Sequence, residues 1–161
     1  MHEADLSILR HFAGIRDVTI ELLRKVPEDW LERPMPGEGD WTPRHAFMHI
    51  AGGQCGWLAG LGDGKKPIDE NAPADRAGIE RALREARARM LDFFGSPEVD
   101  RMSAGCWREH VGRDVVLYLT SHEVHHRGRI VAALWQWGLT DTPFEPREQP
   151  PKRDPLQGPQ G

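Results

Sequence analysis

The chain has 161 residues, a formal net charge of −4 and a pI near 6.1, which suits a single domain with a substantial core. Basic and acidic residues are interleaved, so no basic patch of the kind that binds nucleic acid is present. No apolar run approaches the roughly 20 residues that cross a bilayer, and the N-terminus lacks the pattern of a secretory signal, so we expect a cytoplasmic protein without nucleic-acid or membrane partners.

The first half of the chain predicts two helices. Hydrophobic residues recur at helical spacing over residues 3–26, and we expect the charged residues of this segment to face solvent. Residues 28–40 are rich in proline and glycine and predict a loop. A second helix is predicted over 43–60, because Thr42 can cap it and a proline fits its first position.

The second helix contains four glycines: Gly52, Gly53, Gly56 and Gly60. Each glycine costs about 1 kcal/mol relative to alanine in a helix interior. Gly52 and Gly56 share a face with His49. Two explanations stay open: another element packs closely there, or the missing side chains leave room for a ligand. The second makes Gly52 and Gly56 candidates for a substrate pocket.

The second half predicts two further helices, over 76–94 and 113–137, with an arginine-rich solvated face on the first of them. No alternating apolar and polar stretch predicts a sheet. We therefore expect an all-α fold, a four-helix bundle spanning residues 1–145. Residues 146–161 are rich in proline and poor in hydrophobic residues, and we expect them to form a mobile tail.

Two histidines lie on the buried face of the last predicted helix. His122 and His126 are one turn apart and continue the apolar stripe of Val115, Leu119 and Ile130. A buried imidazole needs a partner for its polar atoms. The pair could begin a metal site, or it could be two core histidines that hydrogen-bond to their neighbours.

Residues 122–126, His-Glu-Val-His-His, also match the H-E-x-x-H pattern of zinc metalloproteases, in which the glutamate is the general base. Its extended form requires a glycine and a third histidine where Arg129 and Ala132 stand. No strand is predicted that could hold a peptide substrate. A zinc protease is therefore a remote alternative, and Glu123 is a weak catalytic candidate.

The second helix offers a third metal ligand. His45 lies in its first turn beside Arg44, whereas His49 lies deeper among apolar neighbours. His49, together with the two histidines of the last helix, would place three neutral imidazoles around one ion. A site with three protein ligands leaves one coordination position open, as in catalytic zinc centres.

Three motifs together resemble the DinB/YfiT-like family of proposed metalloenzymes: Trp41-Thr42, His49-Ile50-Ala51 and the segment from His122 to Gly128. The resemblance implies a DinB-like four-helix bundle with His49, His122 and His126 as metal ligands, and it excludes His125. Arg129 stands where the family has glutamine. A cation there could alter the surroundings of the metal or bind an anionic substrate, which makes Arg129 a further pocket candidate.

The resemblance also implies a function. Family members with assigned roles are thiol-dependent transferases or isomerases that use bacillithiol, mycothiol or glutathione. We therefore expect a divalent metal (zinc, nickel or iron) and a thiol-dependent S-transferase or hydrolase that acts on small electrophiles. The alternative is a non-catalytic metal-binding or stress-associated dimer. A homodimer is also implied; Trp135 and Trp137 are candidates for its interface, unless they are buried under the tail.

Overall fold

The structure is a computed structural model that describes residues 3–95 and 112–143, with side chains from Leu6 in the first helix and from Asp114 in the last. Its elements are α1 (Glu3–Lys25), the short 3₁₀ helix η1 (Glu28–Trp30), α2 (Pro43–Gly60), α3 (Arg76–Gly95) and α4 (Gly112–Gln136). The described residues contain no strand. The predicted all-α four-helix bundle is confirmed, and each helix boundary lies within one residue of its prediction.

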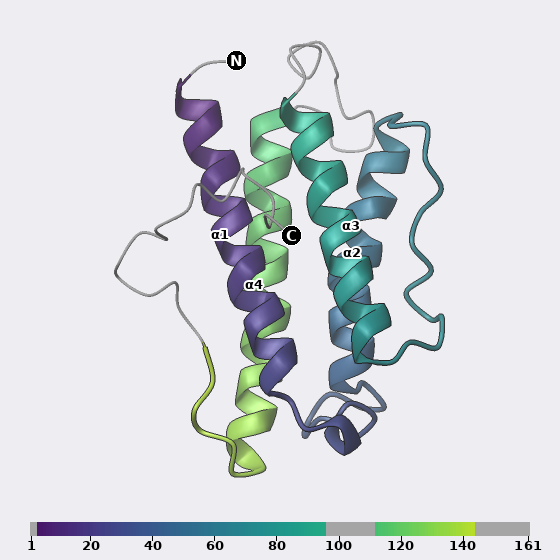
Figure 1. Ribbon diagram of the computed structural model, residues 1–161, viewed down its shortest axis with the longest axis vertical. Helices are drawn as coiled ribbons and strands as arrows, with labels where there is room; N and C mark the ends of the chain where they lie inside the picture. Colours follow the sequence, from purple (N-terminus) through teal and green to yellow (C-terminus); the bar gives the residue numbers. More distant parts are fainter. Residues whose placement is uncertain (1–2, 96–111, 144–161) are drawn as a thin grey trace.

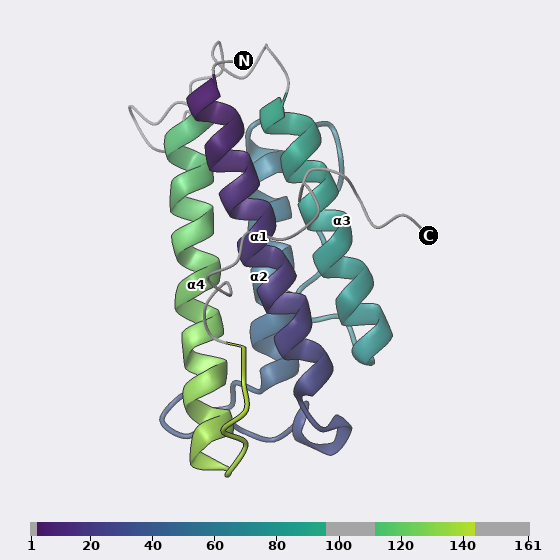
Figure 2. The same cartoon turned by 60° about the vertical axis from the view of Figure 1, so that its left-hand side comes forward.

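The four helices run along the long axis of the molecule (Figures 1 and 2). α1 and α4 run in one direction, and α2 and α3 run in the other. α1 and α2 each pack against both α3 and α4, and they therefore occupy diagonal corners of the bundle. Because α2 and α3 are parallel, residues 61–75 must return along the length of these two helices to connect them (Figure 1). We call this segment the crossover loop.

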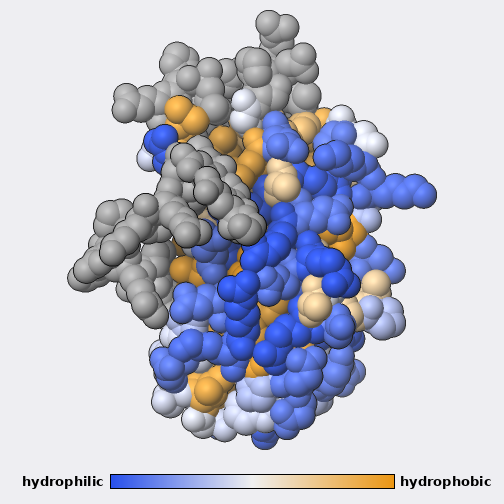
Figure 3. Space-filling view, viewed as in Figure 1, coloured by the Kyte–Doolittle hydropathy of each residue, from blue (hydrophilic) through white to orange (hydrophobic). Residues whose placement is uncertain are grey.

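Apolar side chains from all four helices form the core. The largest cluster includes Leu22, Phe47, Leu83 and Leu134, one from each helix, all completely buried. Cys55 is also part of this cluster, so its thiol has a packing role and burial raises its pKa. The described part of the face drawn in Figure 3 is mostly hydrophilic. This division between core and surface is what drives the four amphipathic helices together.

Three arginines depart from the expected solvated faces: Arg16, Arg87 and Arg89 are all buried. Arg16 of α1 is completely buried, and Arg89 of α3 is only 3% exposed. Arg89 forms an ion pair with Asp63, in which both side chains are buried, and donates a further hydrogen bond of 2.8 Å to the carbonyl oxygen of Lys66. These contacts fasten the crossover loop to α3. A buried guanidinium is tolerated only when its donors are satisfied in this way, and the partners lie far away in the sequence.

The predicted N-cap of α2 is confirmed. The hydroxyl of Thr42 accepts a hydrogen bond of 3.2 Å from the backbone nitrogen of His45, and Pro43 is the first helical residue. We expect the Thr42→Ala substitution to lower the free energy of unfolding by about 1 kcal/mol. Urea denaturation measures this change, with Thr42→Ser as the control because serine keeps the hydroxyl. An unchanged unfolding free energy in the alanine variant would contradict the prediction.

For the C-terminal region, the sequence predicted a domain boundary and two candidate tryptophans at a dimer interface. The boundary predicted at residues 145 and 146 lies in the segment 144–161, outside the described residues. Trp135 is 50% exposed, and its indole nitrogen donates to the hydroxyl of Thr142 over 2.7 Å. Trp137 is partly buried and packs edge-on against Trp30. Neither contact tests the homodimer, which stays a prediction.

Within the described residues, no helix is long and apolar enough to span a membrane.

Candidate metal centre

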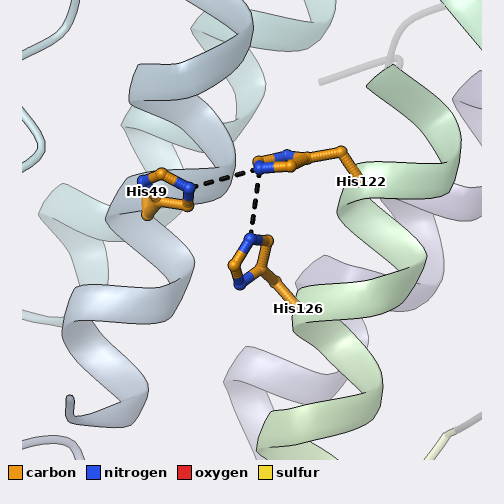
Figure 4. A group of neighbouring side chains, drawn as sticks. All are labelled: His49, His122 and His126. Carbon is orange, nitrogen blue, oxygen red and sulfur yellow. Dashed lines mark hydrogen bonds between the residues drawn. The ribbon is translucent and has the colours of Figure 1, made fainter. Parts of the chain in front are cut away.

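Three histidines from two helices converge between α2 and α4 (Figure 4). His49 projects from α2, and His122 and His126 project from successive turns of α4. The Nε2 atom of His122 lies 3.2 Å from Nε2 of His49 and 3.1 Å from Nε2 of His126. We call these three residues the histidine cluster. Among the described residues they are the group whose ligand atoms could together hold a metal ion.

Hydrogen bonding alone cannot account for both contacts of His122. The ring nitrogen of a neutral imidazole either carries one proton or presents one lone pair. The Nε2 atom of His122 can therefore make a hydrogen bond to His49 or to His126, but not to both in the arrangement observed. Three converging Nε2 atoms are instead the donor set that a divalent ion requires.

The spacing of the nitrogens fits such an ion. Zinc binds imidazole nitrogens at about 2.0–2.1 Å in a tetrahedral arrangement, which separates two ligand nitrogens by about 3.3 Å. The separations of 3.1 and 3.2 Å between the Nε2 atoms are close to this value. The third pair, His49 and His126, has ring centroids 4.7 Å apart. The cluster is therefore already near the geometry of a bound state, without a large rearrangement of either helix.

The protonation of the cluster also suits metal binding. Burial, followed by repulsion from His122, His49 and His125, lowers the pKa of His126 from 6.5 to about 3. Burial is also the main cause that lowers the pKa of His122. Both imidazoles are therefore neutral near pH 7, and the neutral form is the one that binds a metal.

Two aromatic rings lie beside the cluster. The indole of Trp41 stacks on His126 with ring centroids 5.6 Å apart, and it lies edge-on to His49 at 5.1 Å. His45, the other histidine considered for α2, stacks on the same indole and is not part of the cluster. The ring of Tyr118 lies 6.3 Å from that of His122. Trp41 was part of the motif in the sequence, whereas no local pattern indicated the direction of Tyr118.

The structure adds two residues to the surroundings of the cluster. Glu70, in the crossover loop, places a carboxylate oxygen 2.7 Å from Nδ1 of His49. Gly53 faces His122, because a Cβ atom at this position would lie 3.4 Å from the ring. No local pattern pointed to either residue, since Glu70 lies in an irregular loop and Gly53 is one of four glycines.

Glu123 points away from the histidine cluster and into the centre of the bundle. It is completely buried, and Arg16 donates to both of its carboxylate oxygens over 2.9 Å. Thr19 donates to it over 2.7 Å and Gln54 over 3.0 Å. We call these four residues the polar core cluster. With both oxygens engaged in it, the carboxylate is not available to activate a water at the histidines, which removes the catalytic basis of the H-E-x-x-H alternative.

The remaining candidates have different surroundings. His125 is exposed on α4, with its ring 5.0 Å from that of His126. Arg129 pairs with Glu38 and places its guanidinium 5.6 Å from the centre of the Trp41 ring. Gly52 is buried against the crossover loop, whereas Gly56 is exposed, and a Cβ atom added to it would meet nothing within 4 Å. The pocket assignments of Gly52, Gly56 and Arg129 stay predictions.

The chain is thus a four-helix bundle that carries, between two of its helices, a three-histidine cluster suited to a divalent metal. The profile of the DinB family matches residues 1–154, and the chain therefore belongs to the DinB family. It is also similar to the uncharacterized protein YjoA of Bacillus subtilis (strain 168), with 24% identity over 144 residues. This alignment covers 85% of the present chain and 93% of the relative.

Proposed function

We propose that the protein binds one divalent metal ion through His49, His122 and His126. The observation that carries this proposal is the convergence of three Nε2 atoms, which hydrogen bonding between neutral imidazoles cannot satisfy. Membership of the DinB family supports it. Imidazole ligands suit zinc, nickel and iron alike, and the identity of the ion is an outcome of the first experiment.

We further propose that the bound ion serves a thiol-dependent S-transferase or hydrolase reaction on a small electrophile. Three protein ligands leave a coordination position for water or a thiol, and a divalent ion lowers the pKa of the group bound there. His49 and His122 are partly exposed, so the site lies near the surface of the bundle, where a small molecule can approach. The indole of Trp41 provides an apolar wall beside it.

The metal proposal is tested by elemental analysis of the purified protein. We expect about one equivalent of divalent metal in the wild type and its loss in the His122→Ala variant, since only two imidazoles remain. The matched control is His125→Ala, which removes an exposed imidazole from the same helix and should keep the metal. Far-UV circular dichroism establishes that both variants are folded. Full retention of metal in His122→Ala would overturn the proposal.

The reaction is tested on the metal-loaded protein with bacillithiol, mycothiol or glutathione and an activated halide or epoxide. Thioether formation that requires both the metal and one of the thiols supports the S-transferase. Metal-dependent hydrolysis of the electrophile without thiol supports the hydrolase. A protein that binds metal stoichiometrically and accelerates neither reaction would contradict catalysis and leave the non-catalytic metal-binding protein as the function.

A further inference from the structure

Glu70 gives one histidine of the cluster a contact that the other two lack. The carboxylate of Glu70 lies 2.7 Å from Nδ1 of His49. The Nδ1 atoms of His122 and His126 are buried and have no hydrogen-bond partner among the described residues. The three imidazoles are therefore held differently. Within the described part of the chain, only His49 has its ring orientation fixed by a residue outside the histidine cluster.

The contact determines which nitrogen of His49 carries the proton. An ionised carboxylate can only accept a hydrogen bond, so Nδ1 of His49 must be the protonated nitrogen. In the neutral imidazole the lone pair then resides on Nε2, the atom that faces His122 at 3.2 Å. A carboxylate on the distal nitrogen of a metal-binding histidine fixes both the tautomer and the ring orientation, and it makes the ligand more basic.

Gly52 and the crossover loop hold Glu70 in this place. A Cβ atom at Gly52 would lie 3.0 Å from Cβ of Glu70 and 3.1 Å from the carbonyl oxygen of Ile68. The backbone of the loop thus passes directly over the glycine. Both of these distances are tighter than nine in ten real Cβ contacts, and a backbone oxygen cannot move aside as a flexible side chain can.

The loop itself is anchored before it reaches Glu70. Arg89 of α3 binds the carboxylate of Asp63 and the carbonyl oxygen of Lys66, and both ion-pair partners are buried. After Glu70, the backbone nitrogen of Asn71 donates to the carboxylate of Asp69 over 3.0 Å. Glu70 therefore lies within a local turn of a loop that is anchored to α3 on its N-terminal side.

We propose that Glu70 is a positioning residue of the metal centre, and that position 52 is glycine because a side chain there would displace Glu70 from His49. The proposal rests on the metal binding proposed above. The Glu70 and His49 side chains are 39% and 25% exposed, and partly exposed pairs contribute little to folding stability. The contact therefore acts on metal affinity and on the His49 tautomer rather than on the fold.

Zinc affinity, measured by competition with a chromophoric chelator at pH 7, tests the role of Glu70. We expect Glu70→Ala to weaken zinc binding about 10- to 100-fold, the range found when such a partner is removed. Glu70→Gln should lose less, because its amide oxygen can still accept from Nδ1. Urea denaturation of the metal-free variants should show little change. A zinc affinity of Glu70→Ala equal to that of the wild type would overturn the proposal.

A double-mutant cycle tests the role of Gly52. We expect Gly52→Ala to weaken zinc binding in the wild-type background and to add no further loss in the Glu70→Ala background, because both changes remove the same contact. The control is Gly60→Ala, at the exposed end of the same helix, where nothing lies within 4 Å of the added carbon. Equal losses from Gly52→Ala in both backgrounds would contradict the role assigned to Gly52.

The tautomer of His49 provides a readout that needs no metal. In the metal-free protein, ¹⁵N NMR of the imidazole should show the proton on Nδ1, and Glu70→Ala should shift it toward Nε2. If the wild type binds no zinc, the proposed metal function fails. If it binds zinc while Glu70→Ala leaves the zinc affinity unchanged, the positioning role alone fails.

Discussion

Replacing Glu123 with alanine is expected to lower the free energy of unfolding by about 3 to 5 kcal/mol, the range for breaking a buried ion pair by removing one partner. Arg16 would keep its charge in a completely buried position without the carboxylate that satisfies it. The hydroxyl of Thr19 and the amide of Gln54 would lose the same acceptor. The bond from Arg16 to the carbonyl oxygen of Leu83 would remain.

Urea denaturation measures this loss. The metal-free protein is used so that metal binding at the histidine cluster does not contribute to the unfolding free energy. The matched control replaces both charges, Arg16→Leu with Glu123→Leu. We expect this variant to recover part of the stability, because a buried ion pair replaced by apolar residues of similar volume often leaves stability unchanged, whereas Gln54 still lacks both of its partners. A loss below about 1 kcal/mol in the single variant would show that the pair contributes no more than an exposed one.

Acidification from pH 7 to pH 5 is expected to destabilise the metal-free protein through His126, by up to about 2 kcal/mol. The pKa of His126 is about 3 in the folded protein, compared with 6.5 in the unfolded chain. The unfolded chain therefore takes up the proton first. The stability linked to His126 is present above pH 6.5 and is lost as the pH falls from there toward 3. The lowered pKa of His122 acts in the same direction.

Comparison with His126→Gln isolates this effect from other titrating groups. Urea denaturation at pH 7 and pH 5 should show a smaller loss of stability in the variant, since glutamine does not titrate. An equal loss in both proteins would contradict the lowered pKa of His126. Ionised carboxylates add little to the comparison, because their usual pKa values lie below this pH range.

The helices and the three histidines were predictable from local patterns. The helical periods, the Thr42-Pro43 start of α2 and the four-residue spacing of His122 and His126 depend on neighbours along the chain. His49 was identified by its apolar surroundings and by its motif. The structure brings these three residues together as expected, because α2 and α4 pack side by side with their histidines at the same height.

Local sequence patterns therefore specify the four helices, the apolar faces that assemble them and the histidines placed on those faces. The partners of the buried charges and of His49 follow instead from the tertiary packing. Arg16 resembled a solvent-facing residue, yet in the bundle Glu123, Gln54 and Leu83 surround it. Glu70 reaches His49 because parallel α2 and α3 force the crossover loop back along the bundle. Such contacts depend on how distant elements pack, so they cannot be predicted from the periodicity of a single segment.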